Sequence, residues 1–176
     1  MRTTDNAHRL SPAVVVARAE TARELLRHTV ATVAYRGGKA VRGAPAKFAT
    51  FKLSRGSRTP VQILAHIGDL YDWALALAQR QHEWHDSPPL PWDAEVERFF
   101  KTLKRFDEYL ASGAPLKVSA EKLFQGPVAD SLTHVGQLNM LRRLVDSPVK
   151  GENYLKAEIF IGVVGPVQAP PRVEFD

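Results

Sequence analysis

The sequence predicts an all-α domain, a four-helix bundle followed by a short extra helix and a tail. Four long stretches repeat apolar residues every three or four positions, which is the spacing of one helix face. None of them alternates apolar and polar residues as a half-buried strand does, and Pro and Gly lie between them. The chain has 176 residues, 44% of them hydrophobic, which suits one domain with a sizeable core over 1–176. Residues 1–10 and 162–176 are expected to be tails.

The first helix is expected to begin at Ser11-Pro12, because serine is a favoured N-cap and proline fits the first turn. Apolar residues then recur at helical spacing until Gly37-Gly38, where two consecutive glycines are expected to end the helix. The basic, glycine-bearing stretch 39–58 predicts a long surface loop, with at most a short turn of helix.

The second helix has the clearest start in the chain. Thr59-Pro60 followed by Gln62 forms a capping box with proline in the first turn. A broad apolar face follows and contains His66. The helical pattern fades over 82–85, ahead of two prolines.

The third helix is expected to open after Pro91-Trp92, with Asp93 as its N-cap and an end in the stretch 112–115. Its apolar stripe is rich in phenylalanine and leucine, as a core-facing helix requires.

A short helical piece is expected at 119–124, after which Gly126-Pro127 either starts the fourth long helix or kinks the chain into it. The fourth helix is expected to end at 146–148, where a proline follows. A fifth, shorter helix is predicted over 152–161.

Composition limits the function classes. The net charge is +5, but acidic residues are interspersed with most of the basic ones, which favours a solvated surface over a nucleic-acid-binding patch. The sequence has no apolar run near the length of a membrane span and no signal-peptide core, so no membrane partner and a cytoplasmic location are expected. With no cysteine, the chain has no disulfide, cysteine nucleophile or thiolate-rich zinc site.

Three residues form a candidate divalent-metal site. Asp130 and His134 are four residues apart, so on a helix they share one face, and His66 lies on a separate helix. Two imidazoles and one carboxylate are the ligand set of an open metal site that keeps positions for water or substrate. Each residue alone also has a structural explanation: a core histidine with one hydrogen bond, or a carboxylate that favours a helix N-terminus. Burying all three costs several kcal/mol unless they pair or bind a metal, which favours the site.

Other residues are weaker candidates. Asp69, three residues after His66, could accept a hydrogen bond from a ligating imidazole, be a fourth ligand, or pair with an Arg or Lys. Gly136 lies inside the fourth helix, where a glycine is tolerated if a neighbouring helix or a ligand approaches closely. The alternative is that it has no role. Use of His134 and Asp130 as a catalytic base and its orienter is disfavoured, because no serine has a nucleophile-elbow context.

Two stretches resemble a known family. The run from Thr59 to Trp73, TPVQILAHIGDLYDW, is similar to the second helix of the DinB/YfiT-like superfamily of metal-binding four-helix bundles, which carries a single ligand histidine. The run DSLTHVGQL from Asp130 is similar to that family's last core helix, with two ligands four residues apart. Family members commonly have histidine at the position of Asp130; the mycothiol-dependent maleylpyruvate isomerase branch also has a carboxylate there. A carboxylate shifts the preference towards manganese, iron or nickel beside zinc.

The resemblance implies a metal-dependent transferase that uses a low-molecular-weight thiol on a small electrophilic substrate. The ligands would be His66, Asp130 and His134, and the cysteine-free chain fits a nucleophile supplied by the thiol. Asp69, Tyr154 and Glu158 are the candidates for a base or a substrate-orienting group. The alternatives are a metal-dependent hydrolase and a non-catalytic, stress-related metal-binding bundle. A homodimer is the expected assembly.

Overall fold

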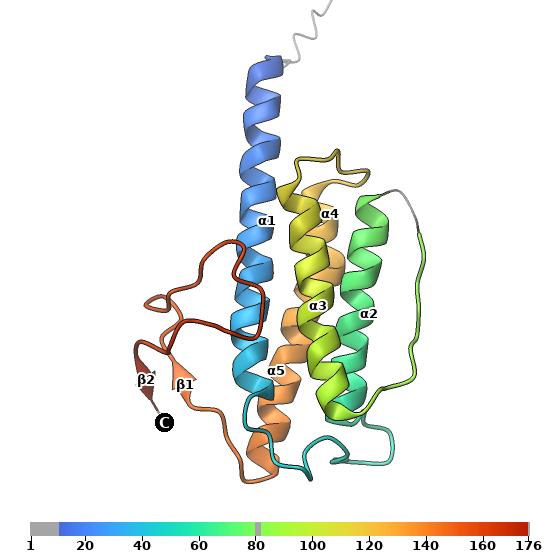
Figure 1. Cartoon of the computed structure of the whole chain (residues 1–176), viewed down its shortest axis with the longest axis vertical. Coiled ribbons are helices and arrows are strands. Elements are labelled where there is room, and N and C mark those ends of the chain that lie inside the picture. The colour runs from blue at the N-terminus through green and yellow to red at the C-terminus, as the bar shows by residue number, and fades with distance from the viewer. Residues whose placement is uncertain (1–10, 80–81, 176) are drawn as a thin grey trace, which may run out of the picture.

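A computed structural model describes residues 11–79 and 82–175 (Figure 1). The expected tail at 1–10 lies outside the described residues. Four long helices lie side by side and form what we call the helical body, and they confirm the all-α class. They are α1 (Pro12–Val41), α2 (Pro60–Ala78), α3 (Trp92–Ala111) and α5 (Ala129–Leu144).

The first helix does not stop at Gly37-Gly38, as the sequence predicted, but continues to Val41. A Cβ atom on Gly37 would lie 2.5 Å from Cζ of Phe99, and one on Gly38 would lie 3.5 Å from Cζ of Phe100. Gly37 therefore lets α1 and an aromatic ring of α3 pack closely, whereas a Cβ on Gly38 would make only an ordinary van der Waals contact. This tertiary requirement outweighs the local tendency of glycine to end a helix.

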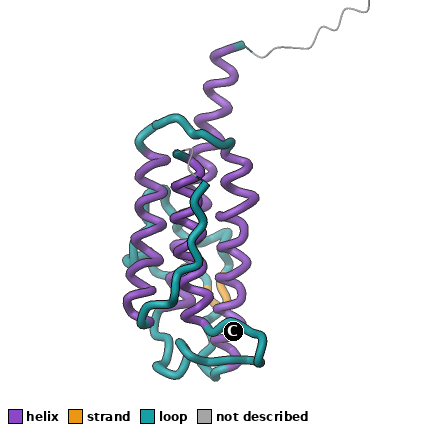
Figure 2. Tube along the Cα trace, turned by 90° about the vertical axis from the view of Figure 1, so that its right-hand side faces the viewer, coloured by secondary structure: helices purple, strands orange, loops and turns teal. Residues whose placement is uncertain are grey.

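The second helix begins as predicted. The side-chain oxygen of Thr59 accepts a hydrogen bond from the backbone N–H of Gln62, and Gln62 Oε1 accepts one from the Thr59 N–H at 2.9 Å. The helix ends at Ala78, earlier than the predicted fading over 82–85, and the chain from 82 to 91 runs back along α2 as a loop (Figure 2). The tryptophan of this loop packs on side chains of α2, which holds the loop there.

The third helix starts two residues earlier than a cap at Asp93 would place it, because Pro91 is the N-cap. No side chain caps this end. Instead the buried carboxylate of Glu95 accepts a hydrogen bond from the backbone N–H of Leu90 at 2.8 Å. This bond ties the end of the preceding loop to the first turn of α3.

Of the two expectations for the fourth long helix, the structure shows the kink: Gly126-Pro127 does not start a new helix. The helix runs without a break from α4 (Ala120–Leu123) through a π-helical turn, η1 (Phe124–Val128), into α5. Pro127 lies inside η1 and has no N–H to donate, so the wider turn accommodates it. The π-helical turn immediately precedes the segment that carries Asp130.

The predicted helix over 152–161 is not formed. Strand β1 (Gly151–Glu152) pairs antiparallel with β2 (Glu174–Phe175), and the chain between them is irregular. The expected tail from 162 is also irregular, but it lies against α1, and Val164 is buried there (Figure 1).

Glu152 anchors this segment to α1. Its carboxylate accepts hydrogen bonds from the Tyr35 hydroxyl at 2.8 Å and from Lys39 Nζ at 2.7 Å, both on α1. Burial alone would raise the pKa of Glu152, but the bonds from Lys39, Tyr35 and the backbone N–H of Arg172 outweigh it and leave the pKa below its ordinary value.

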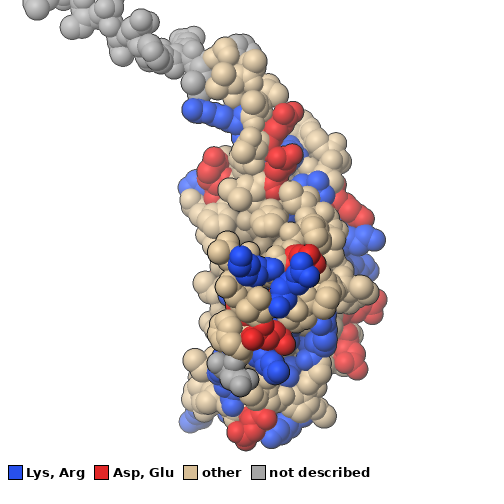
Figure 3. Space-filling view, turned by 90° about the vertical axis from the view of Figure 1, so that its left-hand side faces the viewer, with Lys and Arg blue, Asp and Glu red and all other residues tan. Residues whose placement is uncertain are grey.

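The sequence predicted a surface on which acidic and basic residues are mixed, and the face that carries this C-terminal segment agrees with it. Lys and Arg side chains lie among Asp and Glu there (Figure 3). Within the described residues, no helix is both long enough and apolar enough to cross a lipid bilayer.

Candidate metal centre

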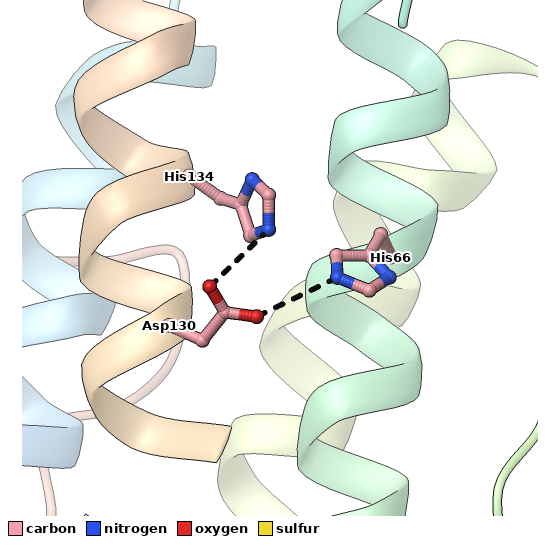
Figure 4. A group of neighbouring side chains, drawn as sticks. All are labelled: His66, Asp130 and His134. Carbon is pink, nitrogen blue, oxygen red and sulfur yellow. Dashed lines mark ion pairs between the residues drawn. The ribbon is translucent and has the colours of Figure 1, made fainter. Parts of the chain in front are cut away.

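His66, Asp130 and His134 come together between α2 and α5 (Figure 4). Asp130 Oδ2 lies 3.7 Å from His66 Nε2, and Asp130 Oδ1 lies 3.6 Å from His134 Nε2. The two imidazole rings are nearly perpendicular, with centroids 4.7 Å apart. One ligand atom from each residue lies within 4.8 Å of the others, so the folded chain brings together the three residues that the sequence singled out. We call this group the His-Asp-His cluster.

The positions of the three residues follow from helix geometry and one buried link. Asp130 and His134 are one turn apart and leave α5 on the same side, as the spacing of four predicts. The hydroxyl groups of Tyr71 on α2 and Ser131 on α5 are hydrogen-bonded at 3.1 Å in the core. This buried bond joins α5 to α2 next to the cluster.

The spacing within the cluster suits a cation better than direct hydrogen bonds. The separations of 3.6 and 3.7 Å exceed hydrogen-bond length. They are shorter than about 4.2 Å, which is twice a zinc–nitrogen bond of about 2.1 Å. The Nδ1 atom of His66 is buried and has no hydrogen-bond partner among the described residues. Nε2, which faces Asp130, is therefore the nitrogen of His66 placed to bind a metal ion, whereas the unpartnered Nδ1 costs about 1–3 kcal/mol whether or not an ion is bound.

Gln137 orients the second imidazole. Its Oε1 atom lies 2.9 Å from His134 Nδ1, and since this oxygen accepts, Nδ1 carries the proton. The lone pair is then on Nε2, which faces Asp130 and the centre of the cluster. Gln137 was not among the residues predicted to support the site; its spacing of three from His134, which places both on one helix face, is the signal that could have found it.

The surroundings favour the metal-binding form of His66. Burial lowers the pKa of His66, the charges of Arg58 and His134 lower it further, and Asp130 opposes them without reversing the shift. The imidazole is therefore neutral at neutral pH, which is the form that binds a metal ion.

The cluster is reachable from solvent. The Asp130 side chain is 47% exposed, whereas those of His66 and His134 are mostly covered. On the His134 side lies an apolar pocket of about 390 Å³, whose lining includes Leu53, Arg58, Ile63, His134, Met140 and Leu141. On the His66 side lies a polar pocket of about 300 Å³, whose lining includes Arg58, Gln62, His66, Asp69, Asp86 and Ser87.

Trp84 covers part of His66. The two rings meet edge to face with centroids 5.5 Å apart, and Trp84 also packs on Trp73 of α2 at 5.7 Å. Metal binding at His66 should therefore alter tryptophan fluorescence, which gives a direct spectroscopic probe of the site.

One interpretation of the sequence was that Asp69 supports His66, but the structure does not place it in that role. Its carboxylate accepts hydrogen bonds from the Ser87 backbone at 3.0 Å and the Ser87 hydroxyl at 2.7 Å, and it pairs with Arg98 of α3. These contacts agree with the alternative interpretation, that Asp69 is the partner of a basic residue.

Tyr154 and Glu158 are engaged elsewhere. Tyr154 packs edge to face on Tyr35 and beneath the guanidinium of Arg36, and Glu158 pairs with Arg172 at 2.8 Å. Both belong to the segment that lies against α1, whereas α2 lies on the other side of the helical body (Figure 1). Their predicted role as base or substrate-orienting group is not supported. Gly136 has no neighbour within 4 Å of a Cβ position, so no close approach explains it.

No protein-family profile, curated protein or solved structure matches this chain.

Proposed function

We propose that this protein binds one divalent metal ion through His66, Asp130 and His134 and is a metal-dependent enzyme. In the proposed reaction, a low-molecular-weight thiol is transferred to a small electrophilic substrate. The observation that carries the proposal is the convergence of three ligand atoms at a solvent-reachable point beside an apolar pocket. Zinc, nickel, iron and manganese are the candidate ions for this donor set.

Different residues of the chain would have different roles in this reaction. His66, Asp130 and His134 would hold the ion, and Gln137 keeps His134 in the tautomer that could bind it. A divalent ion supplies Lewis acidity that lowers the pKa of a bound thiol or water molecule. The apolar pocket beside His134 would hold the substrate body. The nucleophilic sulfur must come from a second small molecule, because the chain contains no cysteine.

The first test is metal content, measured by mass spectrometry on purified wild-type protein and on His66→Ala, Asp130→Ala and His134→Ala. About one ion per chain is expected in the wild type and is expected to be lost in all three variants. His28→Ala is the matched control, because His28 is an exposed histidine of α1 outside the cluster. A wild type that stays empty after incubation with all four ions would refute the proposal.

The second test separates the reaction types. Epoxide and halide electrophiles are incubated with the metal-loaded protein, with and without low-molecular-weight thiols. Turnover that requires the thiol supports the transferase, and turnover without it identifies the hydrolase. Metal binding without turnover in either assay identifies a non-catalytic metal-binding protein.

A further inference from the structure

Arg58 is a cation that faces both pockets next to the cluster. It lines the apolar pocket together with His134 and the polar pocket together with His66. The side chain is exposed, and among the described residues it makes no hydrogen bond or ion pair. Of the two carboxylates in the polar pocket, Asp69 is held by Ser87 and Arg98, and Asp86 forms no ion pair with Arg58.

A bound metal would make this arrangement more positive. Asp130 is the single negative ligand of the cluster, so a divalent ion there leaves one excess positive charge beside Arg58. Two like charges that face the same pockets repel each other, and a bound anionic group would compensate both. The planar guanidinium binds carboxylate or phosphate oxygens with two parallel hydrogen bonds.

The apolar pocket supplies the rest of the recognition. Ile63 and Leu141 form a buried floor, at 3% and 7% exposure, whereas Leu53 and Met140 remain 59% and 58% exposed at its rim. A buried apolar floor with an apolar rim beside a polar cluster is a surface that the apolar part of a ligand can occupy.

We infer that the substrate is an amphipathic anion, whose apolar body occupies the pocket of Leu53, Ile63 and Met140 and whose anionic group binds Arg58. This inference rests on the proposed function, since it names the substrate class of the same site. The anion-binding step itself uses Arg58 and the pocket, not the metal ligands, so it can be measured apart from metal binding.

The test is isothermal titration calorimetry with octanoate and with octanamide, which have the same shape and differ in charge. Wild-type protein is titrated before and after loading with zinc, beside Arg58→Gln and the control Arg55→Gln. Arg55 is an exposed residue of the same loop that lines neither pocket. We expect wild-type protein to prefer octanoate, Arg58→Gln to bind it roughly ten- to a hundred-fold more weakly, and Arg55→Gln to bind it like the wild type.

A second variant tests the pocket. Met140→Glu places a negative charge at an exposed position of its rim and is expected to weaken octanoate binding more than octanamide binding. Equal affinity of wild-type protein for both probes, or octanoate binding that survives Arg58→Gln, would overturn the inference. If the protein takes up no metal but binds octanoate through Arg58, the metal centre is wrong and the anion site stands. If the metal binds and Arg58→Gln binds octanoate as tightly as the wild type, the anion site alone is wrong.

Discussion

Replacing Asp130 by asparagine removes the one carboxylate of the cluster while keeping the size of the side chain. Asp130 Oδ1 lies 3.6 Å from His134 Nε2 and Asp130 Oδ2 lies 3.7 Å from His66 Nε2, so the substitution affects both contacts at once. The side chain is 47% exposed, so without metal the variant should keep the wild-type free energy of unfolding within about 1 kcal/mol.

With metal the two proteins should differ strongly. At a metal concentration about 100 times Kd, binding stabilises the wild type by about 2.7 kcal/mol. In a chain of this length that gain raises Tm by about 5–10 °C. Loss of an outer-sphere partner already weakens metal binding about 10–100-fold, so loss of a direct ligand should weaken it by more than about 100-fold. At the same metal concentration the variant then gains less than about 0.4 kcal/mol.

The assay is thermal unfolding followed by circular dichroism, with EDTA and with each candidate metal, for wild type, Asp130→Asn and the control His28→Ala. The control should shift with metal as the wild type does. An equal metal-induced rise in Tm for Asp130→Asn and wild type would show that Asp130 is not a ligand.

Three further outcomes follow from the packing and charge of other residues. Gln137→Ala frees the His134 ring and should weaken metal binding by about 10–100-fold in a competition titration; unchanged affinity would remove Gln137 from the site. The folded state lowers the pKa of Glu152, so the stability that it contributes is present above the ordinary value of 4.5 and lost as pH falls through the folded value. Proteolysis of the C-terminal segment should therefore accelerate at acid pH in the wild type, whereas Glu152→Gln should be susceptible at neutral pH as well; equal resistance of both proteins would contradict this. Gly136→Ala, with open space around it, should stabilise the protein by about 1 kcal/mol, whereas Gly37→Ala should destabilise it by about 1–3 kcal/mol because its Cβ meets an aromatic ring of α3. Denaturant unfolding measures the change in the free energy of unfolding for both variants. A change of the same sign in both would contradict the packing argument.

The predictable features of this protein depend on residues close together in sequence. The capping box at Thr59 and Gln62 works within one turn, and it starts α2 where expected. The placement of Asp130 and His134 on one face needs only the helical repeat, and the structure confirms it. The proline in the stretch before Asp130 limits the backbone by itself, so a kink at that point was among the expectations.

The features that were missed depend on residues far apart in sequence. Asp69 has the right spacing to support His66, but Arg98 of α3 and Ser87 of the preceding loop hold it instead. The predicted helix at 152–161 has local support, but the bonds from Tyr35 and Lys39 to a buried carboxylate fix that segment in another conformation.

The sequence by itself determined the helical class, the starts of α1 and α2, and the three residues of the candidate site, because periodicity and capping act over a few residues. Only the tertiary structure decided that His66 meets Asp130 and His134, that Gln137 sets a tautomer, and that Arg58 faces both pockets. The physical reason is that packing and charge pairing between distant segments carry free energies as large as the local preferences, and the sequence does not state which distant segments will meet.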